Sequence, residues 1–221
     1  MKTDLSHARV LVIGASGGIG GAAAEAFAAL GADVVRPSRQ ALDFTDDASV
    51  AAWFADAGAF DHVVIAAAQT RTGTVAGLTI QDAQAAMNSK FFGAYRIAKA
   101  VQINAGGSLT LVSGFLSQRP SPSSVLQGAI NAALEALARG LALEKSPVRV
   151  NTVSPGLVDT PLYSAMNTDD RQAMFDKVAA RLPARRVGQP EDIAAAILFV
   201  ATNPFATGST VTVDGGGTIA V

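Results

Sequence analysis

Short apolar runs alternate along the chain with longer stretches in which apolar and polar residues recur at helical spacing. Continuous apolar runs of this kind are typical of strands that are buried on both faces of a parallel sheet. We expect such strands at 10–13, 33–35, 62–66, 108–112, 148–153 and 210–213. We expect helices at 22–30, 46–57, 79–103, 126–144 and 190–201, with a bend near Gly93 and a turn at 106–107.

The alternation of strands and helices determines the fold class that we expect. It implies a parallel sheet with helices packed on both faces, because parallel strands need crossover connections. We find no internal repeat, low-complexity segment or linker that would divide the chain. The pattern therefore predicts one doubly wound α/β domain over residues 1–221.

Composition narrows the possible functions. The chain is 49% hydrophobic and 16% charged with a net charge of −1, so it can bury a core but offers no basic face for nucleic acid. It has no cysteine and only two distant histidines, His7 and His62, which argues against a metal centre. No apolar stretch is long enough to cross a bilayer, and the amino terminus does not resemble a signal peptide. We expect a cytoplasmic protein with no membrane partner.

A glycine-rich loop separates the first expected strand from the first helix. Its glycines stand at 14, 17, 18 and 20, with Ser16 and Ile19 between them. Glycines allow a phosphate to approach the backbone, and the following helix presents free N–H groups and a positive dipole end. The spacing is a variant of the dinucleotide-binding fingerprint, although a glycine turn without a ligand is the alternative.

The residues after the second expected strand bear on the choice of coenzyme. An NAD site usually places a carboxylate there to hold the ribose 2′-hydroxyl. This chain has Ser38 and Arg39 instead, which can hold a 2′-phosphate. We therefore expect NADP(H) to be favoured over NAD(H), the alternative being that the arginines here are ordinary surface residues.

The chain resembles the short-chain dehydrogenases/reductases over essentially its whole length. The resemblance lies in five ordered segments, namely the glycine loop, an adenine-contact motif at 42–44, the segment 149–161, the helix start at 186–194 and the closing strand at 207–216. It implies a Rossmann-like three-layer fold with a seven-stranded parallel sheet. It also implies a nicotinamide coenzyme, a small carbonyl or alcohol substrate, a substrate lid at 162–184, and a homo-dimer or homo-tetramer formed through helices 79–103 and 126–144.

The resemblance also implies a set of coenzyme contacts, which we carry over position by position. In the loop and after the second strand they are Gly14, Ser16, Gly18, Ile19, Gly20, Ser38, Arg39, Asp43 and Phe44. Further along the chain they are Ala66, Ala67, Ala68, Asn131, Pro155, Gly156, Val158 and Thr160.

The sequence departs from the family at the catalytic positions. In the family a serine polarises the carbonyl, a tyrosine donates the proton, a lysine lowers the pKa of that tyrosine, and an asparagine holds a water-linked proton path. Here the tyrosine position falls on Gln127, the lysine position on Asn131 and the serine position on Gly114, with Ser113 immediately before it. Asn88 matches the family's asparagine. Neither amide can replace an ionisable phenol or supply a cation.

Two tyrosines remain as possible acids. Tyr95 and Lys99 have the family's spacing but lie one βα unit too early, so we do not take them as catalytic. One hypothesis is that Tyr163, or a water held by Asn88, replaces the missing acid. The alternative for Tyr163 is a packing residue on the lid.

Two functions follow from these observations. The first is an NADP(H)-dependent oxidoreductase that acts on a carbonyl or alcohol with an atypical proton relay. The second is a nucleotide-binding protein with little catalysis and a regulatory or structural role, because the main acid–base pair is missing. A different reaction on the same frame, such as isomerisation or elimination, is a third possibility.

Overall fold

A computed structural model describes residues 4–220, so the ends of the predicted domain, 1–3 and 221, lie outside the described residues. Its strands are β1 (Arg9–Ile13), β2 (Asp33–Val35), β3 (Phe60–Ile65), β4 (Ile103–Val112), β5 (Arg149–Pro155) and β6 (Thr210–Val213). Its α-helices are α1 (Gly18–Ala29), α2 (Asp47–Ala55), α3 (Ile80–Met87), α4 (Gly93–Ala100), α5 (Val125–Glu144), α6 (Thr168–Ala179) and α7 (Pro190–Thr202). Short helical segments cover Asn88–Phe92, Phe115–Ser117 and Pro161–Tyr163.

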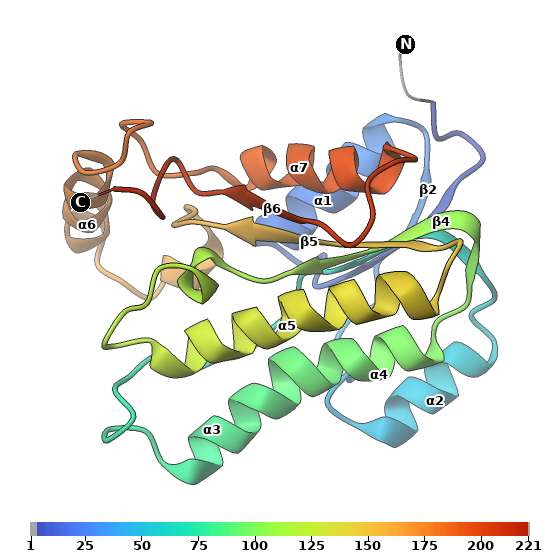
Figure 1. Cartoon of the computed structure of the whole chain (residues 1–221), viewed down its shortest axis with the longest axis horizontal. Coiled ribbons are helices and arrows are strands. Elements are labelled where there is room, and N and C mark those ends of the chain that lie inside the picture. The colour runs from blue at the N-terminus through green and yellow to red at the C-terminus, as the bar shows by residue number, and fades with distance from the viewer. Residues whose placement is uncertain (1–3, 221) are drawn as a thin grey trace.

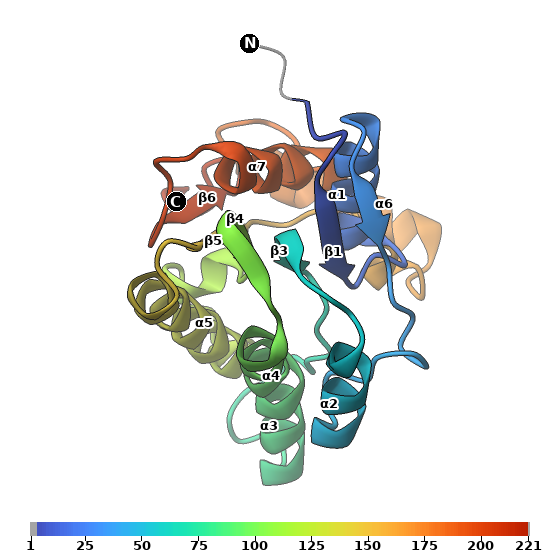
Figure 2. The ribbon, with the colours of Figure 1, turned by 90° about the vertical axis from the view of Figure 1, so that its right-hand side faces the viewer.

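The strands form one parallel sheet in the order β2-β1-β3-β4-β5-β6, with helices on both of its faces (Figures 1 and 2). Alternate side chains of a strand point to opposite faces, so the strands contribute side chains to two hydrophobic cores, one on each face of the sheet. Val10 and Val12 pack in the core with α1 and α7, whereas Leu11 and Ile13 pack in the core with α2, α4 and α5. The predicted Rossmann-like α/β fold is therefore confirmed.

Within residues 4–220 the sheet has six strands, so the predicted seven-stranded sheet is wrong. The stretch 36–46 leads from β2 directly to α2 and contains no strand. A crossover to another parallel strand needs a dozen or more residues, and this stretch is too short to hold one. Consequently β2 forms the edge of the sheet, and the motif 42–44 follows β2 instead of a third strand.

The predicted helix 79–103 is divided and ends earlier than expected. A five-residue π-helical segment, Asn88–Phe92, separates α3 from α4, and α4 ends at Ala100. The division lies beside Gly93, where a Cβ atom would overlap the ring of Phe44. The predicted turn at 106–107 lies within β4, at an irregularity in its pairing with β3.

The parallel strands determine where a site can form. Gly14, Ala66, Ser113 and Gly156 follow β1, β3, β4 and β5, so all four lie at the carboxyl edge of the sheet. Ligands of open α/β sheets bind at this edge. Among the described residues, no helix has both the length and the apolar character needed to cross a membrane.

Candidate active site

The glycine loop is packed too tightly at Gly14 and Gly20 to carry a side chain at either position. A Cβ atom on Gly14 would lie 2.8 Å from the backbone nitrogen of Ala67, and one on Gly20 would lie 2.7 Å from the carbonyl carbon of Gly14. The first turn of α1 has no acidic residue, and no side chain caps it. Its N–H groups and the dipole of α1 therefore face the loop without an internal anion, as a phosphate site requires.

A cleft of about 440 Å³ opens beside this loop. It lies between the ends of β1, β2 and β3, so it combines segments that are far apart in sequence. Nine of the predicted coenzyme residues line it: Gly14, Ser16, Ser38, Arg39, Asp43, Phe44, Ala66, Ala67 and Ala68.

The remaining predicted coenzyme residues do not line this cleft. Gly18 lies against Thr160, because a Cβ atom on Gly18 would be 3.4 Å from the Cβ of Thr160. The segment after β5 is thereby held beside the glycine loop. The other residues outside the cleft are Ile19, Gly20, Asn131, Pro155, Gly156 and Val158.

Asp43 is held as a carboxylate inside the cleft. Its Oδ1 accepts hydrogen bonds from the hydroxyl of Thr45 at 2.6 Å and the backbone N–H of Thr45 at 2.9 Å. The side-chain hydrogen bond from Thr45 is the main cause that lowers the pKa of Asp43. Asn88 connects the π-helical segment to the same place, because its Nδ2 donates to the carbonyl of Thr45 at 3.3 Å.

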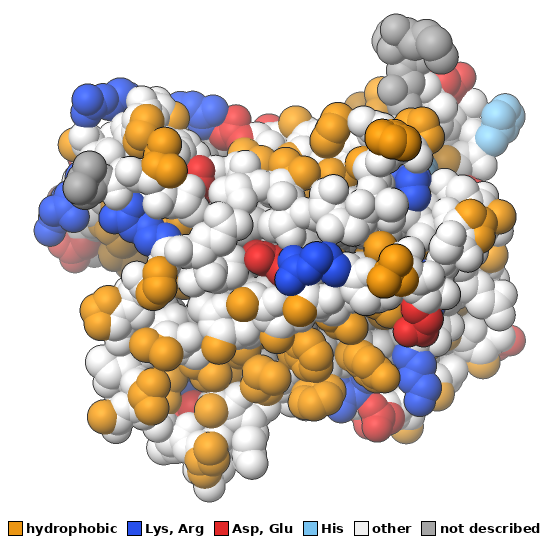
Figure 3. Space-filling model, viewed as in Figure 1, with side chains coloured by type: hydrophobic (Ala, Val, Ile, Leu, Met, Phe, Trp, Pro, Cys, Tyr) orange, Lys and Arg blue, Asp and Glu red, His pale blue; other side chains and the backbone are white. Residues whose placement is uncertain are grey.

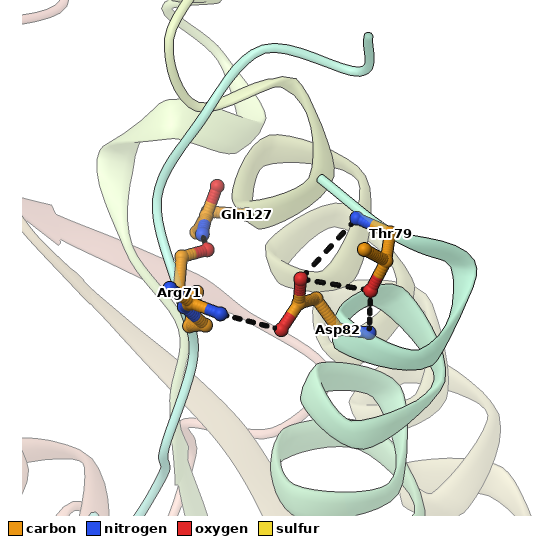
Figure 4. A network of polar contacts seen from close by, with 4 residues as sticks. All are labelled: Arg71, Thr79, Asp82 and Gln127. Atoms are coloured by element: carbon orange, nitrogen blue, oxygen red, sulfur yellow. Dashed lines mark hydrogen bonds and ion pairs between the residues drawn. The ribbon is translucent and has the colours of Figure 1, made fainter. Parts of the chain in front are cut away.

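Gln127 is fixed by the segment that follows β3. Its side chain is buried, and its Nε2 donates a hydrogen bond to the carbonyl of Arg71 (Figure 4). The guanidinium of Arg71 in turn pairs with Asp82 at 2.9 Å, and Asp82 belongs to the capping box of α3. Gln127 Oε1 is buried and has no hydrogen-bond partner among the described residues. The side-chain amide of Gln127 is thus held through its nitrogen, whereas its oxygen accepts no hydrogen bond from the described residues.

Asn131 and Gly114 fit each other. Asn131 is buried, and a Cβ atom on Gly114 would lie 2.7 Å from its Nδ2. A serine at position 114 would therefore require the side chain of Asn131 to move. Gly114 and Asn131 are therefore sterically linked.

Ser113 does not face an open space. Its hydroxyl is buried and donates to Oε1 of Glu135 at 3.0 Å, and the hydroxyl of Ser117 donates to the same oxygen at 2.7 Å. Glu135 lies one helical turn after Asn131 on α5 and is itself buried. This arrangement ties Ser113 to a buried carboxylate.

Lys90 is a site residue that we did not predict from the sequence. Its Nζ donates to Asn131 Oδ1 at 2.6 Å and to the carbonyl of Ser113 at 2.8 Å. Burial lowers the pKa of Lys90 to about 8, and the charge of Glu135 opposes part of that shift. One sequence signal could have identified it, because Lys90 lies four residues from the buried residues Ala86 and Ala94 and so falls on the inner face of the helix.

Comparison with known proteins identifies the family. Residues 36–218 match the family described as Enoyl-(Acyl carrier protein) reductase. The 3-oxoacyl-(acyl-carrier-protein) reductase FabG of Vibrio harveyi is 30% identical in an alignment of 236 positions, gaps included, that covers 93% of this chain and 95% of FabG. The chain belongs to the short-chain dehydrogenase/reductase family. The 2,3-dihydro-2,3-dihydroxybenzoate dehydrogenase of Escherichia coli (strain K12) is 29% identical over 98% of the chain and 99% of its own length.

Solved structures of this family are similar in size as well as in fold. A small-chain dehydrogenase in complex with NADPH is 38% identical with a TM-score of 0.90, covering 96% of this chain and 99% of that one. The predicted membership of the short-chain dehydrogenases/reductases is thus confirmed. The chain is an oxidoreductase of that type.

Other residues considered from the sequence of this short-chain dehydrogenase/reductase have ordinary surroundings. Tyr163 packs edge-on against Phe175 with 5.6 Å between ring centroids, and burial raises its pKa. A raised pKa makes the phenol a weaker proton donor. Tyr95 and Lys99 are exposed on α4. The ring of His62 shares a hydrogen bond of 2.9 Å with Ser108 inside the sheet.

Proposed function

We propose that this chain reduces a carbonyl compound with NADPH. The observation that carries the proposal is the cleft at the ends of β1, β2 and β3, whose glycine loop is shaped for a phosphate and whose rim carries Ser38 and Arg39. When bound, the nicotinamide of NADPH supplies a hydride to the carbonyl carbon. The loop and α1 would hold its pyrophosphate, and Asp43 with Phe44 would border its adenine.

The preference for NADPH rests on Arg39. Arg36 pairs with Glu25 at 2.5 Å, whereas Arg39 has no ion-pair partner among residues 4–220. An uncommitted guanidinium at the mouth of the cleft is suited to a 2′-phosphate.

Replacing Arg39 with alanine is expected to weaken NADPH binding roughly tenfold or more and to leave NADH binding within about twofold. The expected difference arises because only NADPH carries the 2′-phosphate. Coenzyme fluorescence titration measures both dissociation constants. Arg36→Ala is the matched control and should change neither by more than about twofold. Equal weakening of both coenzymes by Arg39→Ala would contradict the role.

The substrate is proposed to enter beside the segment 162–184, which we propose acts as a lid. A second cavity of about 210 Å³ lies between α6, the end of β5 and the carboxyl-terminal segment. It is lined mainly by apolar groups such as Phe115, Leu157, Val178 and Leu182, with Arg119 at its edge. Arg119 is held there by a hydrogen bond of 2.5 Å to the carbonyl of Gly217. A small, partly apolar carbonyl compound suits these walls.

We also propose that the chain forms a homo-dimer or homo-tetramer through α4 and α5. Apolar side chains gather over these helices on the face shown in Figure 3. The exposed large apolar residues of α4, of α5 and of the segment before α4 are Tyr95, Val125, Leu143 and Phe92. A cytoplasmic location stays a prediction from the sequence.

The second candidate is a nucleotide-binding protein with little catalysis. It is favoured by Gly114, Gln127 and Asn131, none of which can ionise. Fluorescence titration with NADPH, followed by NADPH oxidation with a panel of ketones, aldehydes and quinones, separates the two. Binding together with turnover of a panel compound is expected. Tight binding without any turnover would favour the second candidate, and absence of binding would contradict both.

A further inference from the structure

A positive charge reaches the catalytic positions from an unexpected helix. The ammonium of Lys90 lies 2.6 Å from the side chain of Asn131, which stands at the family's lysine position. The cation therefore comes from the segment before α4, whereas the sequence pattern places it on α5. The ammonium of Lys90 therefore supplies a positive charge close to the place where a lysine at position 131 would supply it.

The local backbone explains how Lys90 points inward. It lies within the π-helical segment Asn88–Phe92, and such segments occur frequently at functional sites. The two residues before it are tied to the coenzyme cleft. Asn88 donates to the carbonyl of Thr45, and the hydroxyl of Ser89 accepts the N–H of Gln69 at 2.8 Å. These bonds fix the segment while Lys90 extends toward β4 and α5.

The charges that face Lys90 leave its ammonium able to titrate near neutral pH. From α5 it faces the carboxylate of Glu135 and the neutral amide of Asn131. Directly after β4 it meets the uncharged carbonyl of Ser113, and Asn88 on its own segment is neutral. Burial lowers the pKa of Lys90 to about 8 despite Glu135, so the group is mostly protonated at pH 7. A pKa near the working pH is favourable for a general acid.

Lys90 keeps one donor bond available. An ammonium has three N–H bonds, and this side chain is only partly buried. Lys90 donates two, to Asn131 and to Ser113, and the third has no acceptor among the described residues. Gly114, which lacks a side chain, lies directly beside the amide of Asn131. A donor bond is thus unused next to the position from which the family's serine side chain is missing.

We propose that Lys90 is the proton donor of this site, in place of the family's tyrosine and lysine. The proposal rests on the reductase function proposed above. When the carbonyl carbon accepts the hydride, an N–H bond of Lys90 breaks and an O–H bond forms on the former carbonyl oxygen. The electron pair of the broken bond stays on Nζ, and the resulting amine takes a proton from solvent. Asn131 and Ser113 hold Nζ in place throughout.

The first test is the pH dependence of carbonyl reduction by the whole protein, with the panel compound that is reduced fastest. Because reduction needs the ammonium, kcat/KM should be constant below pH 8 and fall about tenfold per pH unit above it. Lys90→Met should lower kcat/KM by about 10²–10⁴-fold and remove the break near pH 8, with NADPH binding retained. Lys90→Arg keeps a charge that does not titrate and should also lose the break. Lys99→Met is the matched control on α4 and should behave like the unmodified protein.

A second variant tests the role if Lys90→Met fails to fold. The double variant Lys90→Met with Asn131→Lys returns an ammonium to the site from α5. It should recover part of the activity, whereas Asn131→Lys alone should not, because it places two cations together. An inactive but folded double variant that binds NADPH would contradict the proposal.

A readout that does not depend on turnover completes the test. In protein labelled with ¹³C-lysine, the NMR signal that is absent from Lys90→Met reports on Lys90. It should titrate with a midpoint of about 8 and shift when NADPH is added to saturation. A midpoint near 10.5, the ordinary value for lysine, or no response to NADPH would overturn the proposal. Turnover retained by Lys90→Met would overturn the role of Lys90 alone, whereas NADPH binding without turnover of any compound by the unmodified protein would overturn the proposed function and proton donation with it.

Discussion

Gly20→Ala is expected to weaken NADPH binding by about 100-fold, which corresponds to roughly 2.7 kcal/mol. The added Cβ atom would lie 2.7 Å from the carbonyl carbon of Gly14 and would overlap its oxygen. Because these are backbone atoms, the loop and the start of α1 must separate. The N–H groups that face the pyrophosphate would then lose their arrangement. Fluorescence titration with NADPH measures the effect.

The adjacent residue provides the control. A Cβ atom on Gly21 would lie 3.4 Å from the carbonyl oxygen of Ala15, which is almost an ordinary contact. Gly21→Ala should therefore leave NADPH binding unchanged and stabilise α1 slightly, since alanine favours a helix by about 1 kcal/mol over glycine. A Gly20→Ala protein that melts cooperatively and binds NADPH normally would show that the loop does not hold the coenzyme.

Arg149→Met is expected to lower the free energy of unfolding by about 3–5 kcal/mol. Arg149 begins β5, is buried, and donates to the carbonyls of Val200 at 2.7 Å, Ala201 at 2.5 Å and Asn203 at 2.8 Å. These carbonyls belong to the end of α7 and the residues after it, which have no further helical partners. Methionine keeps the apolar stem but leaves the carbonyls without a donor.

Denaturation by urea would measure this loss in the free energy of unfolding, and the melting temperature should fall by roughly 10 °C. The stability of Arg149→Lys should lie between those of the unmodified protein and Arg149→Met, because lysine keeps the charge but lacks the planar guanidinium. Arg139→Met changes an exposed arginine of α5 and should alter stability by less than about 0.5 kcal/mol. A loss below about 1 kcal/mol in Arg149→Met would contradict the role of Arg149 in holding α7 to the sheet.

The fold could be predicted because its signals are local. The apolar run at residues 10–13, which lies in β1, indicates a strand buried on both faces without information from any distant part of the chain. The missing seventh strand was different, because the resemblance to the family supplied that strand and the short stretch 36–46 cannot hold it. The division of the long helix depends on a distant contact, that between Gly93 and Phe44, which periodicity does not reveal.

One part of the candidate site could likewise be predicted from the sequence, and another part could not. Gly14, Ser16, Ser38 and Arg39 could be placed together because each follows a strand at the same edge of the sheet. Lys90 could not, because its meeting with Asn131 requires the inward turn of the π-helical segment and the packing of α5 beside it. Position-by-position comparison with the family shows which residue stands at a given sequence position. It does not show which side chain from another element reaches that position in the fold.

Reduction by this chain is tested most directly with NADPH that carries deuterium at the transferable position of its nicotinamide. The labelled coenzyme is incubated with the chain and the ketones and aldehydes of the panel, whose former carbonyl carbon keeps the transferred atom, and the products are examined by mass spectrometry and NMR. We predict one deuterium on the former carbonyl carbon of a product alcohol, in a single configuration, with one NADPH consumed for each alcohol formed. NADPH that binds tightly while no product acquires deuterium would contradict it.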